Sequence, residues 1–271
     1  MSLSMRPFAF VKSVLRRRLN YTFRLAINGR IFTIPVVYGI GRQNLDNLHD
    51  DVYLVLQHLY SPGTLLVDVG ANVGQTLLQW YALGDKSSRY VGLDINVQCA
   101  AYVEHLINLN GLANATVLPV GLGDSLRLDN LYLTGNPTGV DPAASINTNL
   151  RTSDFYSSKK TVLILPAAKL LPAIAANASV VIVKIDVEGL ELEIIESMHS
   201  WLASTPCDVT FIVEILPPSD FSDQNNQYRL DLHSEIFNLF DSLGYHGVSA
   251  HSYLGLTQTT TPCRDFIFRK R

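Results

Sequence analysis

Apolar runs and polar breaks alternate regularly along this chain, and the pattern predicts strands and helices that follow one another. Short apolar runs of strand length lie at 64–69, 90–94, 116–121, 180–186 and 209–214. Longer segments with helical spacing of apolar residues lie at 74–83, 97–110, 190–202 and 230–243. Strands that alternate with helices usually pair in parallel through right-handed crossovers. The pattern therefore indicates an α/β fold whose sheet is mostly parallel and carries helices on both faces.

The two ends of the chain depart from this alternation. Residues 8–19 place apolar side chains on one helical face, and the strand-like runs 21–27 and 30–37 are joined by Asn28-Gly29, a strong hairpin signal. We therefore interpret residues 1–45 as a helix and hairpin cap that precedes a main domain at 46–271. A short helix is expected at 51–60, and the segments 245–248 and 265–269 are expected to form a closing antiparallel pair.

The middle of the chain has no clear period. Residues 134–160 are rich in Gly, Pro, Asn, Ser and Asp, and a loop of that length inside a domain is usually functional or disordered. It is interpreted either as a lid over a substrate or as a surface insertion. An edge strand is expected at 161–165 and a helix at 167–176.

Composition limits the classes of function. The 271 residues are 47% apolar and 17% charged with a net charge of −3, which supplies a large core and gives no general case for nucleic-acid binding. The charge is uneven, because residues 1–45 contain no acid and eight basic residues. These are Arg6, Lys12, Arg16, Arg17, Arg18, Arg24, Arg30 and Arg42. Contact with an anionic membrane surface through this basic segment is one hypothesis, and a helix with solvated charges is the other.

Cysteine and histidine positions give no local metal motif. Cys99, Cys207 and Cys263 are far apart and no C-x-x-C is present, so reduced thiols in a cytoplasmic protein are the favoured interpretation. His233, His246 and His251 lack metal-ligand spacing and are expected to be surface or structural residues. No apolar run approaches the ~20 residues that span a bilayer, and no signal-peptide pattern is evident.

The segment 65–76 carries the clearest chemical motif. It reads as a buried strand, a tight turn and a helix start, with the spacing D-x-G-x-x-x-G from Asp68 through Gly70 to Gly74. Asp94 ends the next apolar run, where a carboxylate can accept hydrogen bonds from ribose hydroxyls. Asn72 stands in the turn and tolerates left-handed backbone geometry better than most residues.

This turn favours one nucleoside cofactor over another. The dinucleotide fingerprint needs a third glycine, which is missing, and a carboxylate at Asp68 suits a cationic amino group better than a pyrophosphate. The motif therefore favours S-adenosylmethionine over NAD. Asp124, in the Gly123-Asp124 pair after the third strand, is a further candidate for cofactor binding at the adenine.

A second motif lies at 184–191, where Lys-Ile-Asp-Val-Glu-Gly-Leu-Glu closes another buried strand. Asp186 and Glu188 are candidate catalytic residues, and Glu214 ends the neighbouring run 209–214. Nearby carboxylates can act as a general base, bind a divalent cation or orient a hydroxyl, and these alternatives stay open. Lys184 is expected either to pair with one of the acids or to extend to the surface.

Together, Asp-Val-Gly-Ala-Asn-x-Gly, Lys-Ile-Asp-Val-Glu-Gly-x-Glu and Val-Glu-Ile closely resemble the FkbM family of S-adenosylmethionine-dependent methyltransferases. The resemblance covers residues 50–216 approximately. It implies a Rossmann-like class I methyltransferase with a seven-stranded sheet, S-adenosyl-L-methionine as cofactor, and O-methylation of a sugar, glycan or secondary metabolite. The alternatives are an NAD-dependent oxidoreductase and an inactive methyltransferase-like binding domain.

Overall fold

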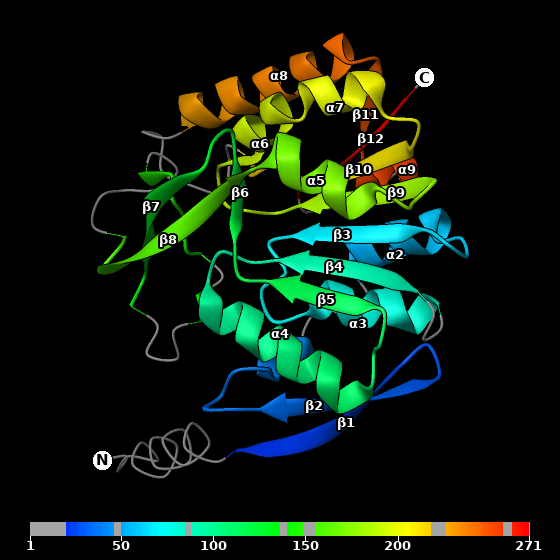
Figure 1. The fold of residues 1–271 in the computed structure, drawn as a ribbon, viewed down its shortest axis with the longest axis vertical. Coiled ribbons are helices and arrows are strands. Elements are labelled where there is room, and N and C mark those ends of the chain that lie inside the picture. Colours follow the sequence, from blue (N-terminus) through cyan, green and yellow to red (C-terminus); the bar gives the residue numbers. More distant parts are fainter. Residues whose placement is uncertain are drawn as a thin grey trace, which may run out of the picture.

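The computed structural model describes residues 20–45, 50–84, 88–135, 140–141, 143–148, 155–217, 226–256 and 262–270. Its centre is a seven-stranded sheet with the order β11-β12-β10-β9-β3-β4-β5 (Figure 1). The five strands from β10 to β5 pair in parallel, and β12 runs antiparallel to both of its neighbours. This order, with one late antiparallel strand, confirms the predicted Rossmann-like class I methyltransferase fold.

The strands and helices of the main domain fall close to the predicted bounds. The strands of the large sheet are β3 (Leu65–Val69), β4 (Arg89–Leu93), β5 (Ala115–Leu118), β9 (Val180–Ile185), β10 (Asp208–Glu214), β11 (Tyr245–Ser249) and β12 (Asp265–Lys270). The helices are α2 (Asp51–Leu59), α3 (Gln75–Leu83), α4 (Val97–Asn110), α5 (Ala167–Ala175), α6 (Glu191–Ser197), α7 (His199–Ser204), α8 (Asn226–Ser242) and α9 (Ala250–Tyr253). Among the described residues, no helix is both long and apolar enough to cross a bilayer.

Alternate residues of each strand enter different cores, because successive side chains of a strand point to opposite faces. Leu66 packs with α2, α3 and α4 on one face, whereas Leu65 and Val67 pack with α5 to α8 on the other. Figure 1 shows α5, α6, α7 and α8 grouped together on one side of the sheet. The sheet is therefore the middle layer of a three-layer sandwich.

The N-terminal hairpin is confirmed. Strands β1 (Tyr21–Ile27) and β2 (Arg30–Val36) pair antiparallel, and Asn28 and Gly29 both have positive φ, at 48° and 76°. Phe32 and Ile34 join the core that contains α4, and Figure 1 shows the hairpin lying beside this helix. The predicted helix at 8–19 and the arginines at 16–18 lie outside the described residues, and the domain division at residue 45 stays a prediction.

Two expectations about the middle of the chain were wrong. The run 116–121 is not one strand: β5 ends at Leu118 and β6 (Gly121–Gly123) begins a second sheet. Pro119 lies between them, and proline has no N–H to continue a ladder. The edge strand expected at 161–165 belongs to β8 (Ser158–Pro166), which is the central strand of the second sheet. It lies between β6 and the unpredicted β7 (Arg127–Leu133).

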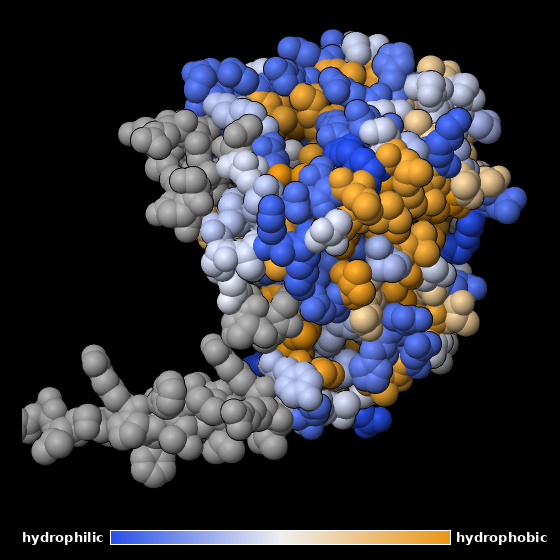
Figure 2. All heavy atoms as spheres, turned by 60° about the vertical axis from the view of Figure 1, so that its left-hand side comes forward, coloured by the Kyte–Doolittle hydropathy of each residue, from blue (hydrophilic) through white to orange (hydrophobic). Residues whose placement is uncertain are grey.

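The small sheet has one buried and one exposed face. Leu131, Leu133 and Val162 form a buried cluster on its inner face. On the outer face Leu128 pairs directly with Leu163, and they are 71% and 39% exposed. Figure 2 turns this side of the molecule forward and shows a broad apolar area next to a polar one. Leu131 of the inner face lines the cavity described below, together with Ile95, Ala144 and Ile146, which pack against the same cluster.

Candidate active site

One cavity lies at the carboxyl ends of β3, β4, β9 and β10, the edge of an open α/β sheet that usually binds ligands. Its volume of about 280 Å³ is close to the ~300 Å³ at which small-molecule sites begin. Six of the nine predicted site residues line it. They are Gly70, Asn72, Asp94, Asp186, Glu188 and Glu214. Asp68, Gly74 and Asp124 do not.

The turn after β3 has the backbone geometry that the sequence predicted. Gly70, Asn72 and Gly74 all have positive φ, at 90°, 46° and 78°. A side chain at Gly70 would overlap the carbonyl oxygen of Asp186, so glycine allows the turn to pack against the end of β9. A side chain at Gly74 would crowd Leu106 of α4. Gly70 therefore shapes the cavity, whereas Gly74 lets α3 approach α4.

Asp94 connects the turn to the end of β4. Its Oδ2 accepts a hydrogen bond from the Asn72 N–H (2.7 Å), and its Oδ1 accepts one from the Asn96 N–H (2.8 Å). Burial raises the pKa of Asp94 to about 7, although these two hydrogen bonds act to lower it. The N-cap of α4 is Asn96 rather than Asp94. Asp94 thus keeps further lone pairs for a ligand in the cavity.

Asp68 and Lys184 form a buried pair behind the cavity. The Tyr90 hydroxyl donates to Asp68 Oδ2 (2.7 Å), and Lys184 Nζ lies 3.6 Å from Asp68 Oδ1. Burial raises the pKa of Asp68, although Lys184 opposes the shift. Burial alone would lower the pKa of Lys184, but the charges of Asp186 and Asp68 outweigh it and raise the pKa above its usual value. Lys184 therefore pairs with acids, and direct cofactor contact by Asp68 stays a prediction.

Asp186 and Glu214 form the acidic wall of the cavity. Lys184 Nζ donates to Asp186 Oδ2 (2.9 Å), and the side chain of Asp186 is 35% exposed toward the cavity. The negative charge of Asp186, together with burial, raises the pKa of Glu214 far above its usual value. Burial opposes ionisation of Asp186 as well, but Lys184 and a hydrogen bond from Glu214 hold its pKa below the usual value. The two opposite pKa shifts thus favour a carboxylate at Asp186 and a proton on Glu214.

Glu188 reaches the cavity by a different route from the one expected. The prediction assumed alternating strand residues, but β9 ends at Ile185 and Glu188 has a left-handed φ of 56°. The segment 143–148 holds this turn: Ser145 Oγ donates to the Glu188 carbonyl (2.5 Å), and Asn147 Nδ2 donates to the Gly189 carbonyl (3.1 Å). Part of the predicted loop thus contacts the second motif.

Asp124 lies away from the cavity. Its side chain is 63% exposed and accepts a hydrogen bond from Arg127 Nη1 (2.7 Å), which also pairs with Glu193. The hydrogen bond from Ser125 is the main cause of its lowered pKa. This position gives no support to the predicted contact with an adenine, although Gly121 and Leu122, just before it, line the cavity.

Several lining residues were not predicted from the sequence. They are mainly apolar residues and a loop acid, namely Ile95, Cys99, Val120, Leu122, Leu131, Asp141, Ala144 and Ile146. Asp141, Ala144 and Ile146 belong to the segment that was interpreted as a lid or an insertion. For Ile95 and Val120, the sequence did contain a usable signal, because both residues lie just after the ends of β4 and β5. Leu131 had no such signal, because β7 was not predicted.

The fold defines a Rossmann-like α/β protein with a cavity at the carboxyl ends of its strands, and comparison with protein families identifies its family. The sequence profile described as the methyltransferase FkbM domain matches residues 68–246. The chain belongs to this methyltransferase family, which confirms the resemblance seen in its three motifs. The comparison with curated proteins gives no significant match.

Solved structures give weaker similarities. A methyltransferase FkbM from Methylobacillus flagellatus KT is 16% identical with a TM-score of 0.45, over 78% of this chain and 44% of that one. The chain therefore spans less than half the length of that protein. An SAH-bound methyltransferase from Podospora anserina, PaMTH1, is 8% identical with a TM-score of 0.46, over 100% of this chain and 98% of that one.

Proposed function

We propose that this chain transfers the methyl group of S-adenosylmethionine to a hydroxyl oxygen of a sugar, glycan or secondary metabolite. The observation that carries the proposal is that Asp94 and Asp186 line the same cavity beside the Gly70 turn. Membership of the methyltransferase family supports the reaction class. The acceptor class comes from the family resemblance.

The residues present fit this cofactor. Asp94 lies at the end of β4 with free lone pairs on both oxygens, where ribose hydroxyls can donate. Leu93, Ile95 and Leu122 supply apolar wall for an adenine ring. S-adenosylmethionine would supply an electrophilic methyl group on a sulfonium.

The acidic wall would then act on the acceptor. A hydroxyl becomes a good nucleophile when its proton leaves as the new bond forms, and Asp186 is the charged carboxylate that can take this proton. Lys184 keeps Asp186 ionised, and Glu214 donates to it. Alternatively, a divalent cation could replace the proton of Glu214 and bind both carboxylates. Glu188, also in the cavity, would contact the acceptor.

Calorimetric titration with S-adenosylhomocysteine, S-adenosylmethionine and NAD tests the cofactor. Binding of the first two and not of NAD is expected, whereas NAD binding alone would make the chain an oxidoreductase. A tritium-transfer screen against glycans and small hydroxylated metabolites then tests the reaction. Cofactor binding without any methyl transfer would favour the inactive binding domain. Repeating the assay with EDTA, and then with added Mg²⁺, distinguishes Asp186 acting as a general base from a divalent cation bound by Asp186 and Glu214.

A further inference from the structure

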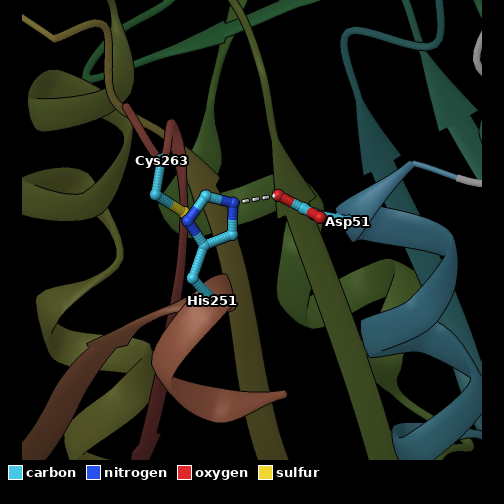
Figure 3. A group of neighbouring side chains, drawn as sticks. All are labelled: Asp51, His251 and Cys263. Carbon is cyan, nitrogen blue, oxygen red and sulfur yellow. Dashed lines mark ion pairs between the residues drawn. The ribbon is translucent and has the colours of Figure 1, made fainter. Parts of the chain in front are cut away.

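A second group of reactive side chains lies at the same edge of the sheet but outside the cavity. Asp51 begins α2, His251 lies in α9, and Cys263 precedes β12. One potential ligand atom of each lies within 4.8 Å of the other two. Figure 3 shows the imidazole of His251 between the carboxylate of Asp51 and the sulfur of Cys263. Asp51 lies 200 positions before His251 and still farther before Cys263, so no local sequence motif could reveal the group.

The surrounding contacts hold these side chains in place. His251 Nε2 lies 2.7 Å from Asp51 Oδ2, and the Cys263 thiol donates to the Asp265 carbonyl (3.2 Å). The Ser249 side chain caps α9 and thereby positions His251. The side chains of Asp51 and His251 are 31% and 13% exposed. An ion could reach the group and would still be sheltered on one side.

The mixture of donors indicates which ion would bind. Oxygen, nitrogen and sulfur together suit zinc and similar transition metals, whereas Mg²⁺ and Ca²⁺ prefer oxygen alone. We propose that Asp51, His251 and Cys263 form a binding site for a divalent transition-metal ion of the zinc class. Three protein ligands leave one coordination position for water or another ligand.

The geometry requires only a modest adjustment. With zinc bonds of about 2.0–2.3 Å, tetrahedral ligand atoms lie roughly 3.3–3.8 Å apart. The three atoms here lie within 4.8 Å of one another, and the Asp51–His251 contact is 2.7 Å. Binding therefore requires side-chain rotations that move the ligand atoms by on the order of 1 Å. The metal would replace both the thiol proton and the direct Asp51–His251 contact.

The proposed site would join three separate parts of the chain near the acidic wall. It would connect the start of α2, the helix α9 and the backbone before β12. Arg264, next to Cys263, lies 4.0 Å from Glu214 Oε1. A bound ion would therefore stabilise the segment that places Arg264 beside Glu214, and it would stabilise the folded state by mass action.

Cobalt(II) titration of the full chain, after removal of metals with a chelator, tests the proposal directly. Cobalt is a spectroscopic substitute for zinc, and thiolate coordination gives a charge-transfer band in the near ultraviolet. The expected result is one cobalt ion per chain with this band, which is lost on adding zinc and kept on adding Mg²⁺. A cation bound only by Asp186 and Glu214 would not produce a thiolate band.

Matched variants locate the site. Cys263→Ser should lose the band, and Cys207→Ser should keep it, because Cys207 donates to the Ala178 carbonyl elsewhere. His251→Gln and Asp51→Asn should keep some of the band but weaken cobalt affinity at least about 10-fold, since even a residue that only orients a metal ligand is worth roughly 10–100-fold. No band in the unsubstituted chain, or an unchanged band in folded Cys263→Ser, would overturn the proposal. If Cys263→Ser does not fold, unchanged affinity in both other variants overturns it as well.

Discussion

Lys184 is the buried cation beside the carboxyl groups at the end of the sheet, whereas Arg264, 4.0 Å from Glu214, is 46% exposed. Lys184 donates to Asp186 (2.9 Å), lies 3.6 Å from Asp68, and is buried. One buried positive charge and the half-exposed Arg264 do not fully balance three carboxylates at low dielectric, and unpaired buried charges are costly. The proton on Glu214 reduces the number of negative charges. The division of roles between Asp186 and Glu214 therefore follows from charge balance rather than from their positions in the sequence.

Substitutions that remove one carboxylate at a time test this division. Asp186→Asn removes the ionised carboxylate, and we expect turnover to fall by roughly 10²–10⁴-fold with little change in cofactor affinity. Glu214→Gln is the matched control, because an amide can still donate to Asp186 as the protonated acid does. Its activity should stay near that of the unsubstituted chain. Single-turnover methyl transfer measures both variants.

Two outcomes of this comparison would contradict the assignment. Full activity in folded Asp186→Asn would exclude Asp186 both as a base and as a cation ligand. An equal loss in Glu214→Gln that depends on added Mg²⁺ would show that both carboxylates bind a cation.

Asp94 carries the prediction for the cofactor. Asp94→Ala should cost about 1.5–3 kcal/mol of S-adenosylhomocysteine affinity, because it removes charge-assisted hydrogen bonds. In the free chain Asp94 has a pKa of about 7. Its carboxylate is therefore lost as the pH falls below this value, and affinity should fall by up to about tenfold per pH unit. Calorimetry between about pH 5.5 and 8 measures this, with thermal melting as a check on folding. A pH-independent affinity in the unsubstituted chain would refute the role of Asp94.

The residues that could be predicted are those that end an apolar run. Asp94, Asp186 and Glu214 each follow or close a buried strand, so their arrival at one sheet edge follows from parallel topology. Asp68 was harder to place. It shares a strand face with Leu66, and its contacts with Tyr90 and Lys184 come from neighbouring strands, so they depend on register. Register is a tertiary property that no local spacing contains.

At the scale of elements, the turn between β3 and α3 depends on Gly70. Gly70→Ala should destabilise the fold by about 1–3 kcal/mol, because alanine disfavours φ of 90° and its Cβ would overlap the Asp186 carbonyl. Gly63→Ala is the matched control: its φ is 86°, but nothing lies within 4 Å of the added carbon. Urea unfolding of both variants separates backbone strain from overlap. Equal destabilisation would mean that the approach of Asp186 has no energetic role.

Most large-sheet strands could be predicted, whereas the small sheet was predicted only in part, through the run 161–165 that lies in β8. Strands such as β9 are buried on both faces and are therefore nearly continuous apolar runs. β7 contains Asp129 and Asn130, which are unfavourable in strands, and it is held by pairing with β8. The predicted helix 190–202 is divided at Met198 into α6 and α7, and no glycine or proline there marks the division.

At the scale of the whole molecule, burial of acids should make stability depend on pH. Burial raises the pKa values of Asp94, Glu191 and Asp265 to about 7, and the pKa of Asp68 is raised as well. The folded state therefore binds more protons than the unfolded state between about pH 4 and 7, and stability declines as pH rises through this range. Burial lowers the pKa of His233, which acts in the opposite direction, and the lowered pKa values of Asp186 and Asp124 act in that direction as well, mainly at lower pH.

Glu191→Gln isolates one of these contributions without touching the acids that line the cavity. Glu191 is 5% exposed and accepts a hydrogen bond from the Gly189 N–H (3.0 Å), which the glutamine oxygen can also accept. Because the variant cannot ionise at this position, its free energy of unfolding should fall less between about pH 5 and 8 than that of the unsubstituted chain. The difference between the two falls should be on the order of 1–3 kcal/mol. Glu196→Gln, at an exposed position of the same helix, should leave the pH profile unchanged. Urea unfolding at several pH values measures all three chains. If the two variants show the same profile as the unsubstituted chain, Glu191 ionises as easily when folded as when unfolded, and its burial does not govern the pH dependence.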